Sequence, residues 1–267
     1  MTDSSEIAVA GAAAALVVDV FFYPLDTIKT RMQASSTIAK PFEFKGLYNG
    51  VGSVILSTLP ASALFFLAYE NAKSELSKYV NAPTAQLTAS ILGELLACSA
   101  IAPADTIKQR AQIQGNQLSS FQVAKIVFSQ KSAWSDIKSG YKAVVLRNLP
   151  VTAAYFPLYE WLREKVEKDF EISKPNAALF AGGFAAMPLA VITTPLDVVK
   201  TRIMLGQGID SNRKGVFSVG LHISKTEGIR TLFKSGMLRG LGAAVGAGIE
   251  LGCYEYTRKY FKLYTEQ

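Results

Sequence analysis

Long apolar stretches alternate with short polar segments along the whole chain. Each apolar stretch reaches the roughly 20 residues that a helix needs to cross a hydrocarbon core. The pattern therefore predicts six membrane-spanning helices, arranged along the chain as three pairs. The first helices of the pairs span 7–33, 84–112 and 175–205, and the second helices span 53–78, 141–168 and 237–263. Within each pair lies a polar, partly amphipathic connector, at 42–49, 119–131 and 217–225.

Two motifs recur once in every helix pair. A proline followed by an acid and two bases ends each first helix, as PLDTIKTRMQ from Pro24, PADTIKQRAQ from Pro103 and PLDVVKTRIM from Pro195. The motif Tyr-Glu-x-x-Lys/Arg lies in each second helix, from Tyr69, Tyr159 and Tyr254. Because both motifs keep one order and similar spacing, they indicate an internal repeat. The predicted repeats are 1–82, 83–173 and 174–267, forming one integrated transmembrane domain.

The acid and the first base of the proline motif lie three residues apart, so they share one face of a helix. With threefold pseudosymmetry, the acid of each repeat reaches the base of the next. The predicted ion pairs, here named the Asp/Lys ring, are Asp26–Lys108, Asp105–Lys200 and Asp197–Lys29. The prolines are expected to bend the helices toward the centre, so that the ring closes a gate. One such cluster alone would fit charges that face lipid headgroups equally well, but three copies favour the gate.

Glutamines are expected to brace two of these pairs. Gln33 and Gln112 each follow the lysine of their own motif by four residues, which places them one helical turn further along the same face. The third copy has Met204 at this position, so its pair lacks the brace.

The Tyr-Glu-x-x-Lys/Arg motif predicts a second set of ion pairs at the other membrane face. The expected pairs, here named the Tyr-Glu ring, are Glu70–Arg163, Glu160–Arg258 and Glu255–Lys73. An exposed ion pair contributes only about 0–1 kcal/mol, which suits a contact that must break and re-form. Two rings at opposite ends favour alternating access, in which one gate closes as the other opens.

Composition favours a membrane protein over a soluble nucleic-acid binder. Hydrophobic residues make up 49% of the 267 residues and charged residues 18%, against about 25% charged in soluble domains. The net charge of +7 comes from bases spread along the chain, so no nucleic-acid partner is expected. No phosphate loop, cysteine pair or nucleophile motif occurs, so the sequence predicts no enzyme, cofactor or metal. The acidic start of the chain fits neither a signal peptide nor a cleavable presequence.

Ionisable residues inside the predicted spans are the candidates for substrate binding, because a charge within a membrane is costly. Asp19, Glu94 and Glu250 are acids, and Arg147 lies near the middle of the fourth helix. Three acids facing few bases indicate a cationic substrate, and one arginine indicates that it also carries a carboxylate. A cationic amino acid or an aminoacyl sulfonium meets both conditions. The alternative is that these four residues neutralise each other or face trapped water.

The two repeated motifs are those of the mitochondrial carrier family, which the chain resembles over essentially its whole length. The resemblance implies an all-α membrane protein with six transmembrane helices in three pseudo-threefold repeats, each with a short matrix-side amphipathic helix. It also implies that the Asp/Lys ring is the matrix gate and the Tyr-Glu ring the cytoplasmic gate. The protein would then be a multi-pass protein of the mitochondrial inner membrane, in contact with lipid that includes cardiolipin.

The resemblance also implies where a substrate is contacted. By position on the even-numbered helices, the family's contact residues fall at Ser57, Ala61, Arg147, Asn148 and Ala243. Aromatic residues near this level are candidates to stack on a base, although ordinary helix packing explains each of them singly as well. They are Phe65, Phe66 and Tyr155.

Within that family, four strings of the chain resemble carriers of S-adenosylmethionine. They are VDVFFYPLDTIKTRMQ, GELLACSAIAPADTIKQRAQ, VVLRNLPVTAAYFPLYEWL and AGGFAAMPLAVITTPLDVVKTRI. The implied activity is import of S-adenosylmethionine into the matrix in exchange for S-adenosylhomocysteine. A carrier of lysine or arginine, and a membrane adaptor that no longer transports, remain as alternatives.

Overall fold

The computed structural model describes residues 20–34, 42–113, 118–170, 173–207 and 215–265. These residues form helices joined by turns, with no strand among them. This confirms the all-α fold class. The chain forms two compact units, one of residues 26–153 and 193–235 and the other of residues 1–25, 154–192 and 236–267.

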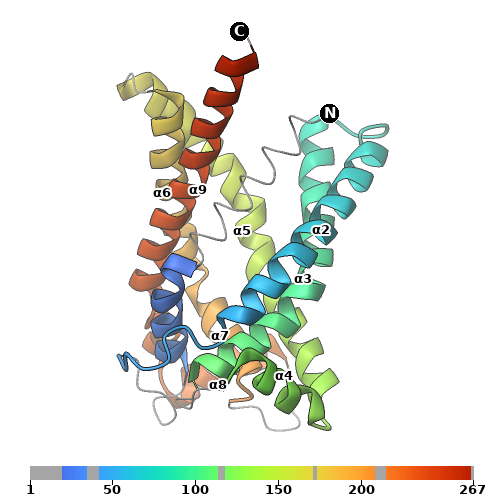
Figure 1. Ribbon diagram of the computed structural model, residues 1–267, viewed down its shortest axis with the longest axis vertical. Coiled ribbons are helices and arrows are strands. Elements are labelled where there is room, and N and C mark those ends of the chain that lie inside the picture. The colour runs from blue at the N-terminus through green and yellow to red at the C-terminus, as the bar shows by residue number, and fades with distance from the viewer. Residues whose placement is uncertain (1–19, 35–41, 114–117, 171–172, 208–214, 266–267) are drawn as a thin grey trace. The chain divides into compact units, whose positions relative to one another are not determined.

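The larger unit contains most of the helices. A helix over 20–33 enters it at Asp26, followed by α2 (Val51–Leu76), α3 (Ala82–Ile113), α4 (Ser120–Ser129) and the first part of α5 (Ala133–Phe170). It also holds α7 (Thr194–Met204), α8 (Val216–Thr226) and the short 3₁₀ helix η1 (Ile229–Phe233). The helices α2 and α3 pack along each other, and α4, α7 and α8 lie at one end of this unit (Figure 1).

The two connector helices are amphipathic and pack on the unit by their apolar side. In α4, Val123 and Val127 are buried against Ile107 and Ala111 of α3. In α8, Val219 and Ile223 are buried against the valines of α7. The spacing of four residues places each apolar pair on one helix face. In the first repeat, the described residues 42–50 form turns.

The smaller unit is built on close contact between α6 (Lys174–Ile192) and α9 (Gly236–Thr265), which run side by side (Figure 1). Glycines make this approach possible. A Cβ atom at Gly183 would lie 2.8 Å from the carbonyl oxygen of Ala244, and one at Gly248 would lie 2.9 Å from that of Leu179. Small residues at such positions are typical of helix pairs in membranes, where backbone contact replaces the hydrophobic effect.

Two predicted helix boundaries are wrong. The fourth helix begins at Ala133, eight residues before the expected residue 141, because the connector continues into it after a turn. The predicted helix 175–205 breaks at Thr193, and Pro195 lies in the first turn of a new helix, α7. A proline is favoured at a helix start because the amide groups of the first turn have no acceptor within the helix, so the missing N–H of proline costs nothing there. In α3, by contrast, the helix continues through Pro103.

Hydropathy alone identifies fewer spans than the repeat pattern does. Among the described residues, the helices Val51–Leu76 and Thr84–Ile113 are long and apolar enough to cross a membrane, and a third qualifies if α6 and α7 count as one broken span. The middle of α5 is less apolar because it contains Arg147 and Asn148. Polar residues of this kind are the candidates for substrate contact, so the site itself weakens the hydropathy signal.

Candidate functional site

The three ion pairs of the Asp/Lys ring are formed in the larger unit. Lys108 Nζ lies 2.8 Å from Asp26 Oδ2, Lys200 Nζ lies 2.6 Å from Asp105 Oδ2, and Lys29 Nζ lies 3.1 Å from Asp197 Oδ2. The pairs connect the helix 20–33 to α3, α3 to α7, and α7 back to the helix 20–33. The ring is therefore a closed cycle of charges, with the pairing that the repeat symmetry predicts.

The glutamine braces also occupy the expected places. Gln33 donates from Nε2 to Asp197 Oδ2 at 2.8 Å and accepts a hydrogen bond from the hydroxyl of Thr201 at 2.7 Å. Gln112 donates to Asp26 Oδ2 at 3.2 Å. Met204 replaces the glutamine in the third copy and is fully buried against Cys98, Ala102 and Val144.

The two braces differ in how completely their amides are satisfied. Both polar atoms of the Gln33 amide form hydrogen bonds, and its Nε2 also contacts Ser235 Oγ at 2.8 Å. The Oε1 atom of Gln112 is buried with no hydrogen-bond partner among the described residues. Leaving a buried polar group without a partner costs about 1–3 kcal/mol, so Gln33 is the better satisfied brace.

We therefore expect Gln33→Leu to destabilise the protein more than Gln112→Leu. The leucine at position 33 removes the hydrogen bonds of Gln33 to Asp197, Ser235 and Thr201, at a total cost of about 1–3 kcal/mol or more. At position 112 the leucine also removes an unsatisfied oxygen, which offsets part of the loss. Thermal unfolding of the two purified variants in detergent measures the difference. Equal unfolding temperatures, or a lower one for Gln112→Leu, would contradict this ordering.

The second base of each proline motif has a role that we did not predict. Arg31, Arg110 and Arg202 donate from Nε to main-chain carbonyl oxygens in the next repeat. The acceptors are Gln112 at 2.8 Å, Met204 at 3.0 Å and Gln33 at 2.7 Å, in the same order. This second cycle fastens the ends of the same three helices. Its sequence signal is the arginine that stands two residues after the lysine in every copy.

The same arginines anchor the connectors. Arg31 donates to the carbonyl oxygens of Glu43 and Lys45 in the first connector. Arg202 forms two hydrogen bonds with the carboxylate of Glu227, at 2.8 and 2.7 Å. A bidentate arginine–carboxylate pair is stronger and more directional than a single contact. Arg31 and Arg202 therefore each tie the helix that carries them to the connector that follows it.

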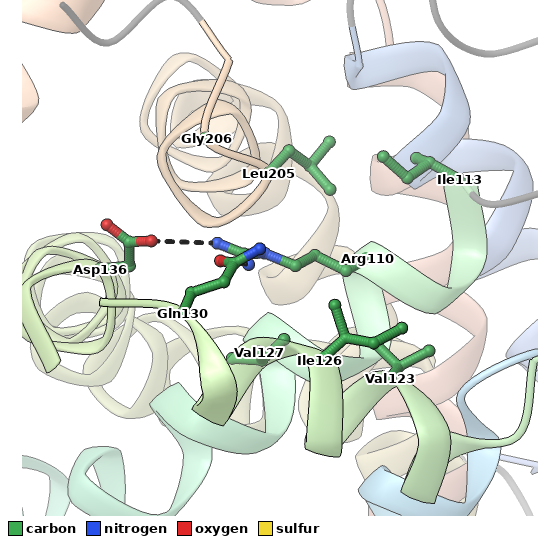
Figure 2. A pocket seen from close by; sticks show the side chains of 9 residues that line it. All are labelled: Arg110, Ile113, Val123, Ile126, Val127, Gln130, Asp136, Leu205 and Gly206. Atoms are coloured by element: carbon green, nitrogen blue, oxygen red, sulfur yellow. Dashed lines mark hydrogen bonds and ion pairs between the residues drawn. The ribbon is translucent and has the colours of Figure 1, made fainter. Parts of the chain in front are cut away.

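Arg110 lines a pocket formed mainly by residues of α3 and α4 (Figure 2). Its guanidinium donates to Gln130 Oε1 at 2.9 Å and to Asp136 Oδ2 at 3.3 Å. Apolar residues of α3 and α4 form much of the remaining wall, among them Ile113, Val123, Ile126 and Val127. Because Gln130 and Asp136 already bind this guanidinium, we interpret Arg110 as an anchor for the connector that contains α4.

Three of the substrate-binding candidates lie in direct contact. Asn148 donates from Nδ2 to Glu94 Oε1 at 2.7 Å, and Arg147 donates from Nη1 to Asn148 Oδ1 at 2.8 Å. The thiol of Cys98 also donates to Glu94, at 3.4 Å. A carboxylate and a guanidinium therefore lie on either side of one amide. This arrangement offers separate groups for a positive and a negative end of one ligand.

The other candidates on α2 have packing contacts. Ser57 donates to the carbonyl oxygen of Val54 at 3.0 Å, and Ala61 is buried. Phe65 packs on α3, where a Cβ atom at Gly93 would lie 3.0 Å from its ring. Phe66 is 57% exposed. The assignment of Phe65 or Phe66 to a substrate base stays a prediction.

The smaller unit holds several further candidates. Ala243 is half-buried on α9, and Tyr155 stacks on Tyr159 with ring centroids 6.2 Å apart. Asp19 and the side chain of Glu250 lie outside the described residues. Their predicted roles in cation binding stay predictions.

The Tyr-Glu ring stays a prediction as well. The ammonium of Lys73 lies over the ring of Tyr69, 5.3 Å from its centroid, while Glu70 and Glu160 are exposed. Arg163 belongs to the smaller unit. The side chains of Glu255 and Arg258 lie outside the described part of α9.

Comparison with known proteins identifies relatives along the whole chain. The family model described as "Mitochondrial carrier protein" matches three times in succession, at residues 3–80, 79–170 and 173–265. The mitochondrial S-adenosylmethionine carrier protein of Xenopus laevis is 38% identical over 258 residues, which cover 93% of this chain and 94% of the relative. The mouse protein of the same description is 36% identical over 94% of this chain and 92% of its own length.

A plant relative extends this comparison. S-adenosylmethionine carrier 1, chloroplastic/mitochondrial, of Arabidopsis thaliana is 37% identical, covering 94% of this chain and 77% of the relative. An uncharacterized mitochondrial carrier of Schizosaccharomyces pombe is 36% identical over 95% of this chain. The similarity therefore extends across animals, plants and fungi.

Proposed function

Since this chain belongs to the mitochondrial carrier family, we propose that it imports S-adenosylmethionine through the mitochondrial inner membrane in exchange for S-adenosylhomocysteine. The observation that carries the proposal is the contact between Glu94, Asn148 and Arg147, on a chain whose relatives include S-adenosylmethionine carriers. The protein works as a transporter, not an enzyme.

The substrate and the cluster have complementary charges. S-adenosylmethionine carries a sulfonium, an amino group and a carboxylate. Glu94 attracts the cationic groups, with Asp19 as the second acid, and Arg147 binds the carboxylate through paired hydrogen bonds. An adenine ring needs an apolar or aromatic surface, for which Phe65, Phe66 and Tyr155 are the candidates. A nucleotide polyphosphate is disfavoured because the acids repel it.

Transport follows from two gates that do not open together. The Asp/Lys ring closes the matrix side with three ion pairs, two of them braced by glutamine. The Tyr-Glu ring closes the cytoplasmic side when the matrix gate is open. Substrate charges near the first ring weaken it by competing for its partners, because a buried charge needs an opposite charge and the substrate supplies an alternative one. Lipid, including cardiolipin, surrounds the helices.

Uptake into liposomes tests the proposal directly. Full-length protein is reconstituted with S-adenosylmethionine or S-adenosylhomocysteine inside, and labelled S-adenosylmethionine is added outside. We expect uptake that requires internal substrate and that unlabelled S-adenosylmethionine and S-adenosylhomocysteine inhibit, while lysine, arginine and ATP do not. Uptake of lysine or arginine in place of S-adenosylmethionine would favour the basic amino-acid carrier. Absence of exchange for every solute would favour a membrane adaptor.

A further inference from the structure

A continuous chain of contacts connects the candidate substrate site to the Asp/Lys ring. It begins at Glu94, passes through Asn148 to Arg147, and ends at Asp197, whose Oδ1 lies 3.4 Å from Arg147 Nε. All four residues belong to the larger unit. Asp197 lies on α7 and is a member of the Asp/Lys ring, so Arg147 belongs at once to the substrate site and to the surroundings of the gate.

Asp197 is the most deeply buried acid of the ring. Its side chain is 3% exposed, against 30% for Asp26 and 19% for Asp105. It pairs with Lys29 and accepts a hydrogen bond from Gln33 on its Oδ2 atom, while its Oδ1 atom faces Arg147. A buried carboxylate depends strongly on such partners, because burial in itself disfavours its charge.

The contact of Arg147 with Asp197 is incomplete. The Nε atom of Arg147 is buried, yet no described residue forms a hydrogen bond with it, and the 3.4 Å to Asp197 is an ion pair only. A guanidinium prefers two parallel hydrogen bonds to one carboxylate. A substrate carboxylate that reaches Arg147 offers this geometry, so it is a better partner than Asp197 is in the closed ring.

We propose that the substrate carboxylate and Asp197 compete for Arg147, so that the carboxylate releases the matrix gate in addition to being bound. This inference rests on the proposed function. Asn148 is a positioning residue, since its amide holds Arg147 on one side and Glu94 on the other. A cationic group that binds Glu94 draws it away from Asn148, while the carboxylate draws Arg147 away from Asp197. A ligand with both groups therefore breaks the chain at both ends.

The proposal predicts that the carrier distinguishes ligands with a carboxylate from those without one mainly by the rate of gate opening, and less by binding affinity. Part of the carboxylate's binding energy replaces the lost contact with Asp197 and so does not raise affinity. An interaction that forms only as the gate opens accelerates gate opening without raising the affinity of the closed carrier for the ligand. A cation without a carboxylate is expected to occupy the site and leave the gate closed.

The test compares S-adenosylmethionine with its decarboxylated analogue, which keeps the sulfonium, amine and adenine. In proteoliposomes of the full-length protein, we expect the analogue to inhibit S-adenosylmethionine uptake with an inhibition constant within about tenfold of the substrate's KM. Labelled analogue itself should enter at least about tenfold more slowly than S-adenosylmethionine. Equal uptake of the two ligands by the unmodified protein overturns the inference, and so does an analogue that does not inhibit.

Two matched variants then locate the effect. Asp197→Asn removes the acid that competes for Arg147, and we expect the uptake ratio of the two ligands to approach one. Asp105→Asn removes the same charge from the pair with Lys200 and should keep the ratio of the unmodified protein. A ratio that falls equally in both variants contradicts a specific role of Asp197. If Asp197→Asn does not fold, the inference is tested by the comparison of S-adenosylmethionine with its decarboxylated analogue on the unmodified protein. Absence of S-adenosylmethionine uptake by the unmodified protein would instead refute the proposed function.

Discussion

Replacing Arg147 with alanine is expected to reduce S-adenosylmethionine uptake by about 100-fold or more. The guanidinium is the candidate partner of the substrate carboxylate, and losing one member of a buried ion pair costs about 3–5 kcal/mol. A loss of 1.4 kcal/mol already corresponds to a factor of ten. The measurement is the initial rate of labelled uptake into proteoliposomes at matched protein content.

The control for this variant is Arg147→Lys. Lysine keeps the positive charge but cannot form the two parallel hydrogen bonds of a guanidinium with a carboxylate. We therefore expect partial uptake, between that of the Arg147→Ala variant and that of the unmodified protein. Circular dichroism and thermal unfolding establish that both variants fold. Full uptake by a folded Arg147→Ala protein would show that Arg147 serves packing and not substrate binding.

Reversing one charge of the Asp/Lys ring should have an effect of similar size. Lys108→Asp places a second carboxylate beside Asp26, where the ammonium now lies 2.8 Å from Oδ2. Like charges at such a separation repel, and the braced pair cannot form. We expect uptake to fall about 100-fold. The reciprocal double variant, Asp26→Lys with Lys108→Asp, restores opposite charges and should recover uptake to within about tenfold of the unmodified protein.

The control for charge reversal lies outside the ring. Lys78 pairs with Glu75 at 2.8 Å on an exposed turn of the chain, so Lys78→Asp changes the net charge by the same amount. Exposed pairs of this kind contribute about 0–1 kcal/mol, and uptake should remain near that of the unmodified protein. Failure of the double variant to exceed the single one would mean that Asp26 and Lys108 act separately and not as a gate pair.

The Asp/Lys ring was predictable from sequence because each part of it is local and repeated. The spacing of three residues between Asp26 and Lys29 fixes their helix face, and the threefold repeat fixes which neighbour each one meets. The position of Gln33, one turn after Lys29, follows from the same geometry. The all-α fold follows from helix length. These features require no knowledge of the packing between distant segments.

Features that depend on packing could not be predicted in this way. The Nε atoms of Arg31, Arg110 and Arg202 donate to main-chain carbonyl oxygens. Every residue type has such an oxygen, so the sequence does not indicate which residue is the acceptor. The contact between Phe65 and Gly93 depends on the rotation of two helices about their axes. The contact between Arg147 and Asp197 was not predictable either, because the two residues belong to different repeats and Arg147 lies outside both repeated motifs.

The arginine cycle does not depend on the side chains of the residues that accept its hydrogen bonds. Its acceptors are the main-chain carbonyl oxygens of residues 33, 112 and 204, which every amino acid provides. A substitution at any of these three positions therefore keeps the hydrogen bond of the arginine, even where it removes the contacts of the original side chain. Glutamine donates a hydrogen bond to an aspartate of the Asp/Lys ring there, whereas methionine at 204 fills apolar space in its place. Single substitutions at these positions are therefore expected to change how firmly the proposed gate closes, one repeat at a time, while the arginine hydrogen bonds remain.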